Sequence, residues 1–160
     1  MASEGAGVVR TRVLRWPIKI KQPMASVFPS VLVVDDFPDG REMVAEYLAF
    51  RGFSVLQAAT GAEAITLARK HRPRLILMDL GMPGLDGWET TRLLKADSRT
   101  RSCVIVALTA HALTSQRASA LSAGCDEVIA KPFDLSDLAE TVDRIVNAGA
   151  TQPKRKRNLA

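Results

Sequence analysis

The sequence has few cysteines and no long apolar run, and each scarcity excludes a class of protein. Two cysteines in 160 residues cannot build a disulfide framework and indicate a reducing compartment. No apolar stretch reaches the roughly 18–20 residues needed to span a bilayer. Charges and a proline interrupt the first 28 residues, which therefore lack the continuous apolar segment of a secretory signal. We expect a cytoplasmic protein without membrane insertion.

Acidic residues are scarce at the two ends of the chain, although the formal charge of +5 does not reveal this. Residues 1–28 hold five basic residues and one acid, and residues 149–160 hold four basic residues and no acid. The stretch between them, residues 29–148, has 13 basic and 16 acidic residues. We predict a basic flexible leader (1–28), one folded domain (29–148) and a basic disordered tail (149–160). From these ends we expect no nucleic-acid binding beyond a weak, salt-sensitive and non-specific contact.

Short apolar runs without polar alternation are typical of parallel strands that are buried on both faces. Four such runs stop at polar residues: Val31–Val34 before Asp35 and Asp36, Leu75–Met78 before Asp79, Val104–Leu108 before Thr109, and Val128–Ala130 before Lys131. In an open α/β sheet, ligands bind outside the carboxyl ends of the strands. Three carboxylates, a hydroxyl and an ammonium group should therefore meet at one edge. Like charges this close repel each other, so a cation is expected among them.

Helix signals alternate with these runs. Pro38 begins a helix with an apolar stripe of Met43, Val44, Tyr47, Leu48 and Phe50, which Gly52 closes, and residues 53–56 are expected as strand two. Thr60 with Glu63, and Asp86 with Glu89, are spaced as N-terminal caps of the next two helices. Two further helices are expected over 113–123 and 135–147, the first of them only weakly amphipathic. The pattern predicts an α/β domain, a (βα)₅ doubly wound parallel five-stranded sheet.

The ordered set of motifs resembles the receiver domain of two-component response regulators. The matching segments are Asp35-Asp36, the stretch from Met78 to Gly87, Thr109-Ala110, and Lys131-Pro132-Phe133, and the resemblance covers residues 30–148. It implies a flavodoxin-like receiver fold with strand order 2-1-3-4-5, an order that right-handed crossovers also favour.

The resemblance also assigns roles. Asp79 would be the nucleophile and phosphoacceptor. Asp35, Asp36, Asp79 and the backbone carbonyl of Gly81 would bind Mg²⁺, with Mn²⁺ as an alternative, because hard cations prefer oxygen ligands. Thr109 and Lys131 would contact the phosphoryl group, and the Lys131–Pro132 peptide bond would be cis.

Three positions qualify this assignment. His111 lies two residues beyond Thr109, where family members vary, and is held as a modulator of dephosphorylation. Gly81, two residues beyond Asp79, has no side chain to position or block water. Val128 stands where many family members have a Tyr or Phe that rotates on phosphorylation. We therefore expect the signal to pass through the fourth helix, whose Ala- and Ser-rich sequence offers little apolar area to hold it in place.

The function expected is that of a stand-alone receiver, phosphorylated on Asp79 by a histidine kinase or a histidine phosphotransfer protein. It would catalyse only its own phosphorylation and dephosphorylation, and would either switch the binding of an output protein or relay the phosphoryl group. A homodimer is left open. Three alternatives are a Mg²⁺-dependent phosphohydrolase with an aspartyl nucleophile, a nucleic-acid-associated regulator acting through its basic ends, and a receiver fold used as an unphosphorylated scaffold. The intact acidic set disfavours the scaffold. Gly81 disfavours the hydrolase, because haloacid-dehalogenase-type enzymes have a second acid at that place.

Overall fold

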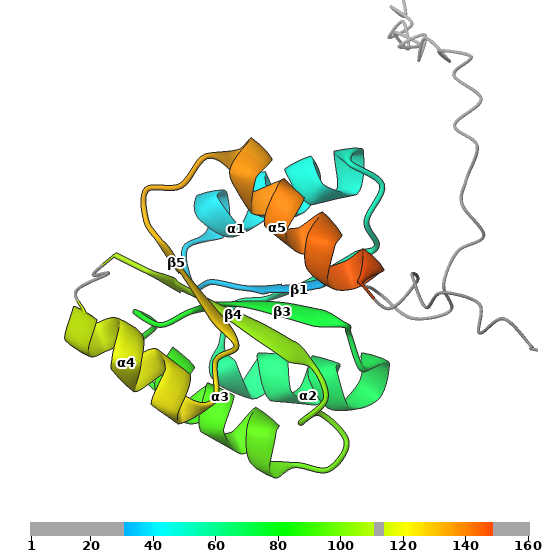
Figure 1. The fold of residues 1–160 in the computed structure, drawn as a ribbon. Helices are drawn as coiled ribbons and strands as arrows, with labels where there is room; N and C mark the ends of the chain where they lie inside the picture. The colour runs from blue at the N-terminus through cyan, green and yellow to red at the C-terminus, as the bar shows by residue number, and fades with distance from the viewer. Residues whose placement is uncertain (1–30, 111–113, 149–160) are drawn as a thin grey trace, which may run out of the picture.

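The structure, a computed structural model, describes residues 31–110 and 114–148. The predicted leader, tail and modulator His111 lie outside these residues. Five strands alternate with five helices along the chain (Figure 1): β1 (Val31–Val34), α1 (Pro38–Phe50), β2 (Val55–Ala58), α2 (Gly61–His71), β3 (Leu75–Asp79), α3 (Gly87–Ala96), β4 (Val104–Thr109), α4 (Thr114–Ala123), β5 (Glu127–Ala130) and α5 (Leu135–Asn147).

All five strands are parallel and form one sheet in the order β2-β1-β3-β4-β5. The predicted fold and strand order are therefore confirmed. The three central strands are the most apolar ones, and every residue of β1 and β3 is buried. Because the strands run in one direction, their carboxyl ends meet at one edge of the sheet, which carries the polar residues singled out above.

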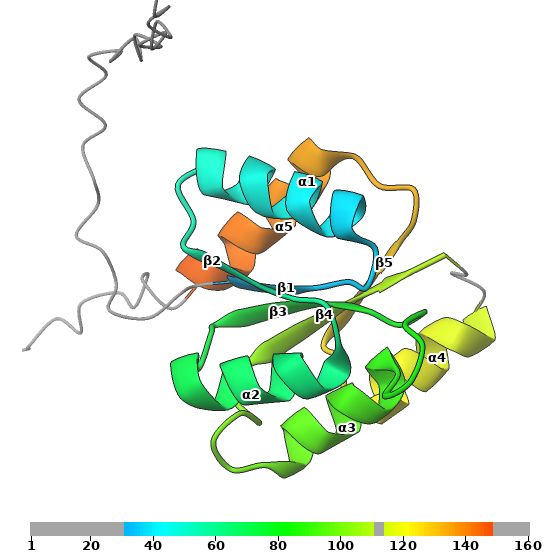
Figure 2. The same ribbon diagram turned by 180° about the vertical axis from the view of Figure 1, so that it is seen from behind.

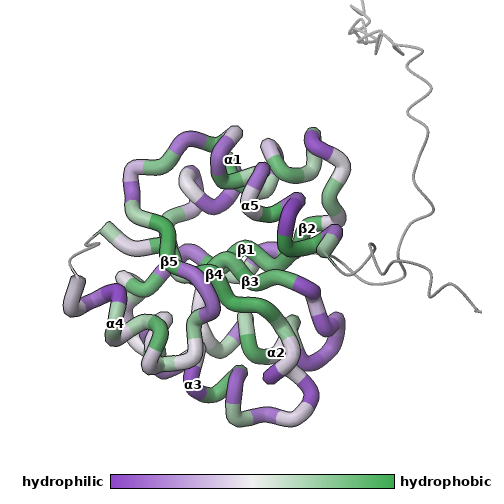
Figure 3. Tube along the Cα trace, in the orientation of Figure 1, coloured by the Kyte–Doolittle hydropathy of each residue, from purple (hydrophilic) through white to green (hydrophobic). Residues whose placement is uncertain are grey.

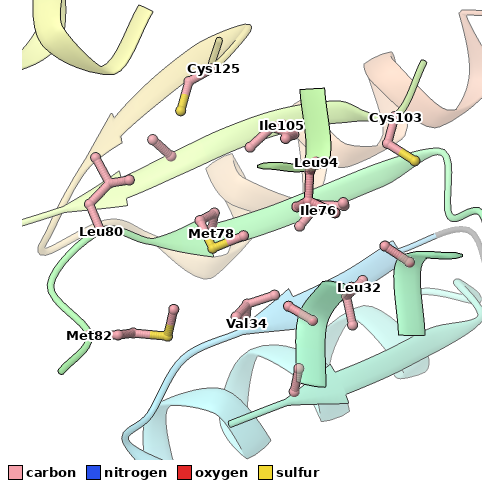
Figure 4. Close-up of a cluster of buried hydrophobic side chains, with 14 of the residues drawn as sticks. Leu32, Val34, Ile76, Met78, Leu80, Met82, Leu94, Cys103, Ile105 and Cys125 are labelled. Atoms are coloured by element: carbon pink, nitrogen blue, oxygen red, sulfur yellow. The ribbon is translucent and has the colours of Figure 1, made fainter. Parts of the chain in front are cut away.

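Alternate residues of the strands point to two cores, one on each face of the sheet. Helices α1 and α5 cover one face, and α2, α3 and α4 cover the other (Figures 1 and 2). Figure 4 shows part of the second core, where Leu32 and Val34 of β1 lie beside Ile76 and Met78 of β3. Coloured by hydropathy, the strands are mostly hydrophobic, while hydrophilic stretches lie on the helices and connections (Figure 3).

Strand two lies two residues later than predicted, at 55–58 instead of 53–56. An edge strand takes its bounds from its single neighbour, and here the pairing with β1 runs from Val31 opposite Val55 to Val34 opposite Ala58. Ser54 precedes the strand, and its backbone carbonyl accepts a hydrogen bond from the backbone N–H of Val31 (3.1 Å). Phe53 packs instead into the core beneath α1 and α5.

The stripe predicted for α1 is partly wrong. Val44 and Leu48 face the core together with Ala45, but Met43 is 52% exposed and Phe50 is 86% exposed. A helix that packs on one face of a sheet buries one narrow stripe, and Met43 and Phe50 lie outside the stripe that α1 buries.

The predicted caps of α2 and α3 are confirmed. The Thr60 hydroxyl accepts a hydrogen bond from the backbone N–H of Glu63 (3.1 Å), and the Asp86 carboxylate accepts one from that of Glu89 (2.8 Å). Gly52, just beyond α1, has a φ of +95°, in the left-handed region that glycine adopts without strain. No helix within 31–110 and 114–148 has the length and apolarity to cross a membrane.

Candidate functional site

The acidic pair after β1 gives one buried and one exposed carboxylate. Asp35 continues the strand ladder through its backbone N–H, which donates to the carbonyl of Ala58 (3.2 Å). The residue is 7% exposed, and its Oδ1 accepts a hydrogen bond from the backbone N–H of Phe37 (2.9 Å). Asp36 is exposed, and its carboxylate makes no hydrogen bond or ion pair to any described residue. Its oxygen lone pairs are therefore available to a ligand.

Asp79 ends β3 in the centre of the sheet and is 8% exposed. Its Oδ1 accepts a hydrogen bond from the backbone N–H of Gly81 (2.9 Å), which orients the carboxylate. The start of α3 passes close over the same backbone, since a Cβ placed on Gly87 would lie 2.3 Å from the Asp79 carbonyl oxygen. Only glycine fits at position 87, and the tight crossing holds the end of β3 in place.

Lys131 supplies the positive charge of the site. Its Nζ lies 3.3 Å from Oδ2 of Asp35 and 3.5 Å from Oδ2 of Asp79. The backbone N–H of Lys131 donates to the carbonyl of Thr109 (2.8 Å), so the ends of β4 and β5 are joined next to the carboxylates. Thr109 is buried at the last position of β4, and the peptide bond from Lys131 to Pro132 is cis.

The donor set fits a hard divalent cation. Oxygen atoms of Asp35, Asp36 and Asp79 lie within 4.8 Å of one another, and the group contains no sulfur or imidazole ligand. Three negative charges face the single ammonium group of Lys131, which leaves an excess of negative charge. Such an all-oxygen acidic triad is typical of a Mg²⁺ site.

Two clefts meet at Asp79 and Lys131. One, of about 530 Å³, also contains Asp35 and Asp36 and has a largely apolar wall that includes Phe37, Met43 and Phe133. The other, of about 380 Å³, lies toward α3 and α4 and includes Gly81, Trp88, Thr109 and Gln116. The carboxylate of Asp79 is thus buried by its neighbours in the chain yet open to a small group from either side.

The structure brings together all the predicted site residues that it describes. Asp35, Asp36 and Asp79 form the triad, Lys131 contacts two of its members, and Thr109 and Gly81 line the cleft toward α4. Sequence reasoning missed the residues that shape the clefts. Phe37 could have been found, because it follows the acidic pair directly in the sequence. Nothing in the spacing of Gln116, on α4, indicated that it would reach the site. Arg41 was missed too, and its guanidinium donates to the backbone carbonyl of Asp35 (2.8 Å).

Comparisons with known proteins agree with this geometry. The family described as response regulator receiver domain matches residues 31–143. The polar-differentiation response regulator DivK of Brucella anthropi is 34% identical over 113 residues, which cover 71% of this chain and 92% of DivK.

Among solved structures, the chemotaxis protein CheY4 of Vibrio cholerae is 30% identical, with a TM-score of 0.70 over 74% of this chain and 98% of CheY4. The receiver domain of the sensor histidine kinase PA1611 from Pseudomonas aeruginosa is 34% identical, with a TM-score of 0.69 over 75% of this chain and 98% of that domain. The PA1611 structure has a magnesium ion coordinated in its active-site cleft. Receiver domains take phosphoryl groups from histidine kinases and are signalling modules more than conventional enzymes. Matched over most of its length by family, sequence and structure, the chain belongs to the response regulator receiver family.

Proposed function

We propose that Asp79 is the phosphoacceptor of this receiver, and that a histidine kinase or a histidine phosphotransfer protein in the cytoplasm is the donor. The observation that carries the proposal is the position of this carboxylate. It ends the central strand, lies 3.5 Å from the Lys131 ammonium group, and shares an acidic triad with Asp35 and Asp36. A buried carboxylate with a lysine and two further acids around it suits phosphoryl transfer better than a structural cap.

In the proposed reaction, an oxygen of Asp79 forms a new O–P bond while the bond between phosphorus and the donor's histidine nitrogen breaks. Attack of one anion on another is opposed by charge repulsion, so the carboxylate needs cations beside it. Lys131 already contacts Asp79 and is placed to pair with a phosphoryl oxygen once the acyl phosphate has formed. The Thr109 hydroxyl, from the neighbouring strand, would donate to a second phosphoryl oxygen.

The metal ligands proposed are Asp35, Asp36, Asp79 and the backbone carbonyl of Gly81. Mg²⁺, or Mn²⁺ in its place, would neutralise the excess negative charge of the triad and the charge that develops on the phosphoryl oxygens. Two of these ligands are held ready for a metal by the chain itself. The backbone N–H of Gly81 orients the Asp79 carboxylate, and Asp36 is exposed and unpaired among the described residues.

Phosphorylation would then act on an output partner or pass the phosphoryl group onward. The boundaries 29–148 are proposed for the phosphoryl-accepting unit, since every group of the site lies between Asp35 and Lys131 and the matched family region ends at residue 143. On this view the two basic ends are accessory to the chemistry.

The deciding experiment is incubation with Mg²⁺ and acetyl phosphate, followed by intact-mass measurement. One stably added phosphoryl group, absent when EDTA replaces Mg²⁺, is the expected result. Continuous release of inorganic phosphate with no phosphorylated species at any time would instead favour the hydrolase. Asp39→Asn, a matched change of an exposed acid on α1 outside the triad, should label like the wild type.

A further inference from the structure

The edge of the sheet opposite the site carries an excess of positive charge. The connections and helix ends that lead into β2, β3 and β4, residues 51–54, 69–74 and 97–103, hold seven basic residues and a single acid, Asp97. These three segments are called the basic edge below. The remaining described residues hold six basic and 15 acidic residues. The domain is therefore strongly polarised although its total charge is small.

The three segments are neighbours in space. The start of β1 lies between β2 and β3, and the backbone N–H of Val31 donates to the carbonyl of Ser54 (3.1 Å). The carbonyl of Arg74 accepts from the N–H of Val104, at the end of the third segment (3.0 Å). In Figure 3, the end of α2 and its connection to β3 are coloured as hydrophilic residues. The three segments thus lie along the amino-terminal edge of the sheet, with the start of β1 between the first and the second.

Most of these cations are not neutralised. Arg69 and Arg99 both pair with Asp97, at 2.7 Å and 3.0 Å. The other five are exposed and form no ion pair with any residue that the structure describes: Arg51, Lys70, Arg72, Arg74 and Arg101. Unpaired cations at one edge of a domain repel each other, and a partner with regularly repeated negative charge would relieve that repulsion.

The two ends of the chain add to this charge. The first described strand, β1, begins on the side of the basic edge, and the last described helix, α5, ends on the same side. Two opposite views show this (Figures 1 and 2). The segments attached there, 1–28 and 149–160, contain nine basic residues and one acid. Both basic segments are therefore attached on the side of the domain that faces away from Asp79.

We propose that the basic edge binds the phosphate backbone of a nucleic acid, without reading base sequence, while the site at the opposite edge stays open. Six of its seven cations are arginines, whose planar guanidinium groups match phosphate oxygens in pairs. The inference does not depend on the proposed phosphoryl transfer.

A lipid surface is the other large polyanion, and the structure disfavours it. Membrane-binding helices present an apolar face beside their cations. Here the apolar neighbours of the cations in 69–74 are used by the core: Ala68 and Leu75 are fully buried, and Pro73 is buried between Arg72 and Arg74.

The test is fluorescence anisotropy of the full chain with a labelled short DNA duplex, measured between 50 and 200 mM NaCl. Arg74→Gln/Arg101→Gln removes two unpaired cations from the basic edge. Arg92→Gln/Arg117→Gln, on α3 and α4, lowers the net charge by the same two units elsewhere. We expect the edge variant to bind about tenfold more weakly at low salt. The slope of log affinity against log salt concentration should become less steep by about 2. The control should stay within about twofold of the wild type, by the same reasoning on phosphate contacts.

A second edge pair, Lys70→Gln/Arg72→Gln, should reproduce the loss, and thermal melts should show all three variants folded. Equal losses in the edge and control variants would overturn the proposal, because net charge alone would then explain binding. So would the absence of duplex binding by the wild type, or binding only to phosphatidylserine-containing vesicles with the same sensitivity to Arg74 and Arg101. Asp79→Asn should bind the duplex like the wild type, which separates this result from that of the phosphorylation experiment.

Discussion

The two edges of the sheet balance their charges in opposite ways. At the carboxyl ends of the strands, Asp35 and Asp79 share one lysine, and Asp36, the third carboxylate of the triad, has no partner among the described residues. At the amino-terminal ends, one carboxylate is shared by two arginines. Asp97 accepts from Nε of Arg69 (2.7 Å) and from Arg99 through Nη2 (3.0 Å), Nε (3.2 Å) and the backbone N–H (2.9 Å).

The aspartates at the two edges therefore differ in how many donors of the domain bind their oxygens. The pKa of Asp97 is held well below its usual range, first by the Arg99 side chain and backbone and then by Arg69. Its oxygens are occupied by donors from within the domain, which makes it a structural residue linking the end of α2 to the connection after α3. The carboxylates of the site have few internal donors, and this is what leaves them free for a metal and a phosphoryl group. Unpaired charge, more than the number of charged residues, therefore marks a binding edge.

The largest expected effect is the loss of phosphoryl uptake when Asp79, and no other carboxylate, is replaced. Asp79→Asn is nearly isosteric, so the domain should stay folded, but the amide cannot act as a nucleophile and phosphoryl uptake should fall to background. Intact-mass measurement after incubation with Mg²⁺ and acetyl phosphate gives the answer, with Asp97→Asn as the matched change at the opposite edge. Undiminished labelling of the Asp79→Asn protein would contradict the assignment.

Asp36→Asn should show that charge imbalance is what binds the metal. Without divalent cations, removing one of three neighbouring negative charges should leave the free energy of unfolding unchanged or raise it by up to about 1 kcal/mol. Adding Mg²⁺ at a hundred times its Kd should stabilise the wild type by about 2.7 kcal/mol, and the variant should lose most of that gain. Urea unfolding with and without Mg²⁺ measures both quantities.

Asp39→Asn controls for the loss of a negative charge near the same edge and should keep the full response to Mg²⁺. If Asp36→Asn were destabilising in EDTA and unaltered in its response to Mg²⁺, Asp36 would be a structural residue like Asp97, and the contrast between the edges would fail.

The strand-end residues were predictable from sequence because their placement follows from one rule. Strands buried on both faces read as unbroken apolar runs, and parallel strands end at the same edge. The residues after Val34, Met78 and Leu108 could therefore be assigned to one site without any knowledge of the tertiary contacts. The two capping signals were equally local, since a cap and its partner are three residues apart.

Features set by packing between distant segments could not be predicted in this way. The bounds of β2 depend on its pairing with β1, and the exposed position of Met43 depends on which stripe of α1 the core accepts. The ion pair between Arg69 and Asp97 joins residues 28 positions apart, and nothing in the local sequence distinguishes Asp97 from a residue of the site. The clefts around Asp79 likewise arise from side chains on three separate helices and loops.

A smaller effect is expected at the basic edge, where Asp97→Asn should lower stability in a pH-dependent manner. Because the pKa of Asp97 is lower in the folded than in the unfolded protein, its contribution is present above the unfolded value and is lost as pH falls through the folded one. The difference in Tm between wild type and variant should be full at pH 7 and shrink below about pH 4. A difference that stayed constant between pH 7 and pH 3 would show that the arginines do not act on the charge of Asp97.

The smallest effect is a local change in backbone protection that should reach α4 and leave the basic edge untouched. Helix α4 buries only two alanines, Ala120 and Ala123, whereas α5 buries Leu138, Ala139, Val142 and Val146. With so little apolar area to hold it, α4 should respond most readily when Thr109 moves toward a phosphoryl group. We expect no rotamer switch at residue 128, since Val128 is β-branched and buried, and a side chain this short and stiff cannot swing between buried and exposed positions.

Hydrogen exchange with and without beryllium fluoride, a mimic of the acyl phosphate, should therefore change at the start of α4. Exchange should stay the same around Val128 and across residues 69–74 and 97–103, because these lie on β5 and at the far edge. Asp79→Asn, treated identically, should show no change and so controls for effects of the mimic away from the site. Protection that changed mainly along β5 would mean that the signal leaves by another route. Protection that changed at the basic edge would mean that the two edges are coupled, and nucleic-acid affinity should then depend on phosphorylation.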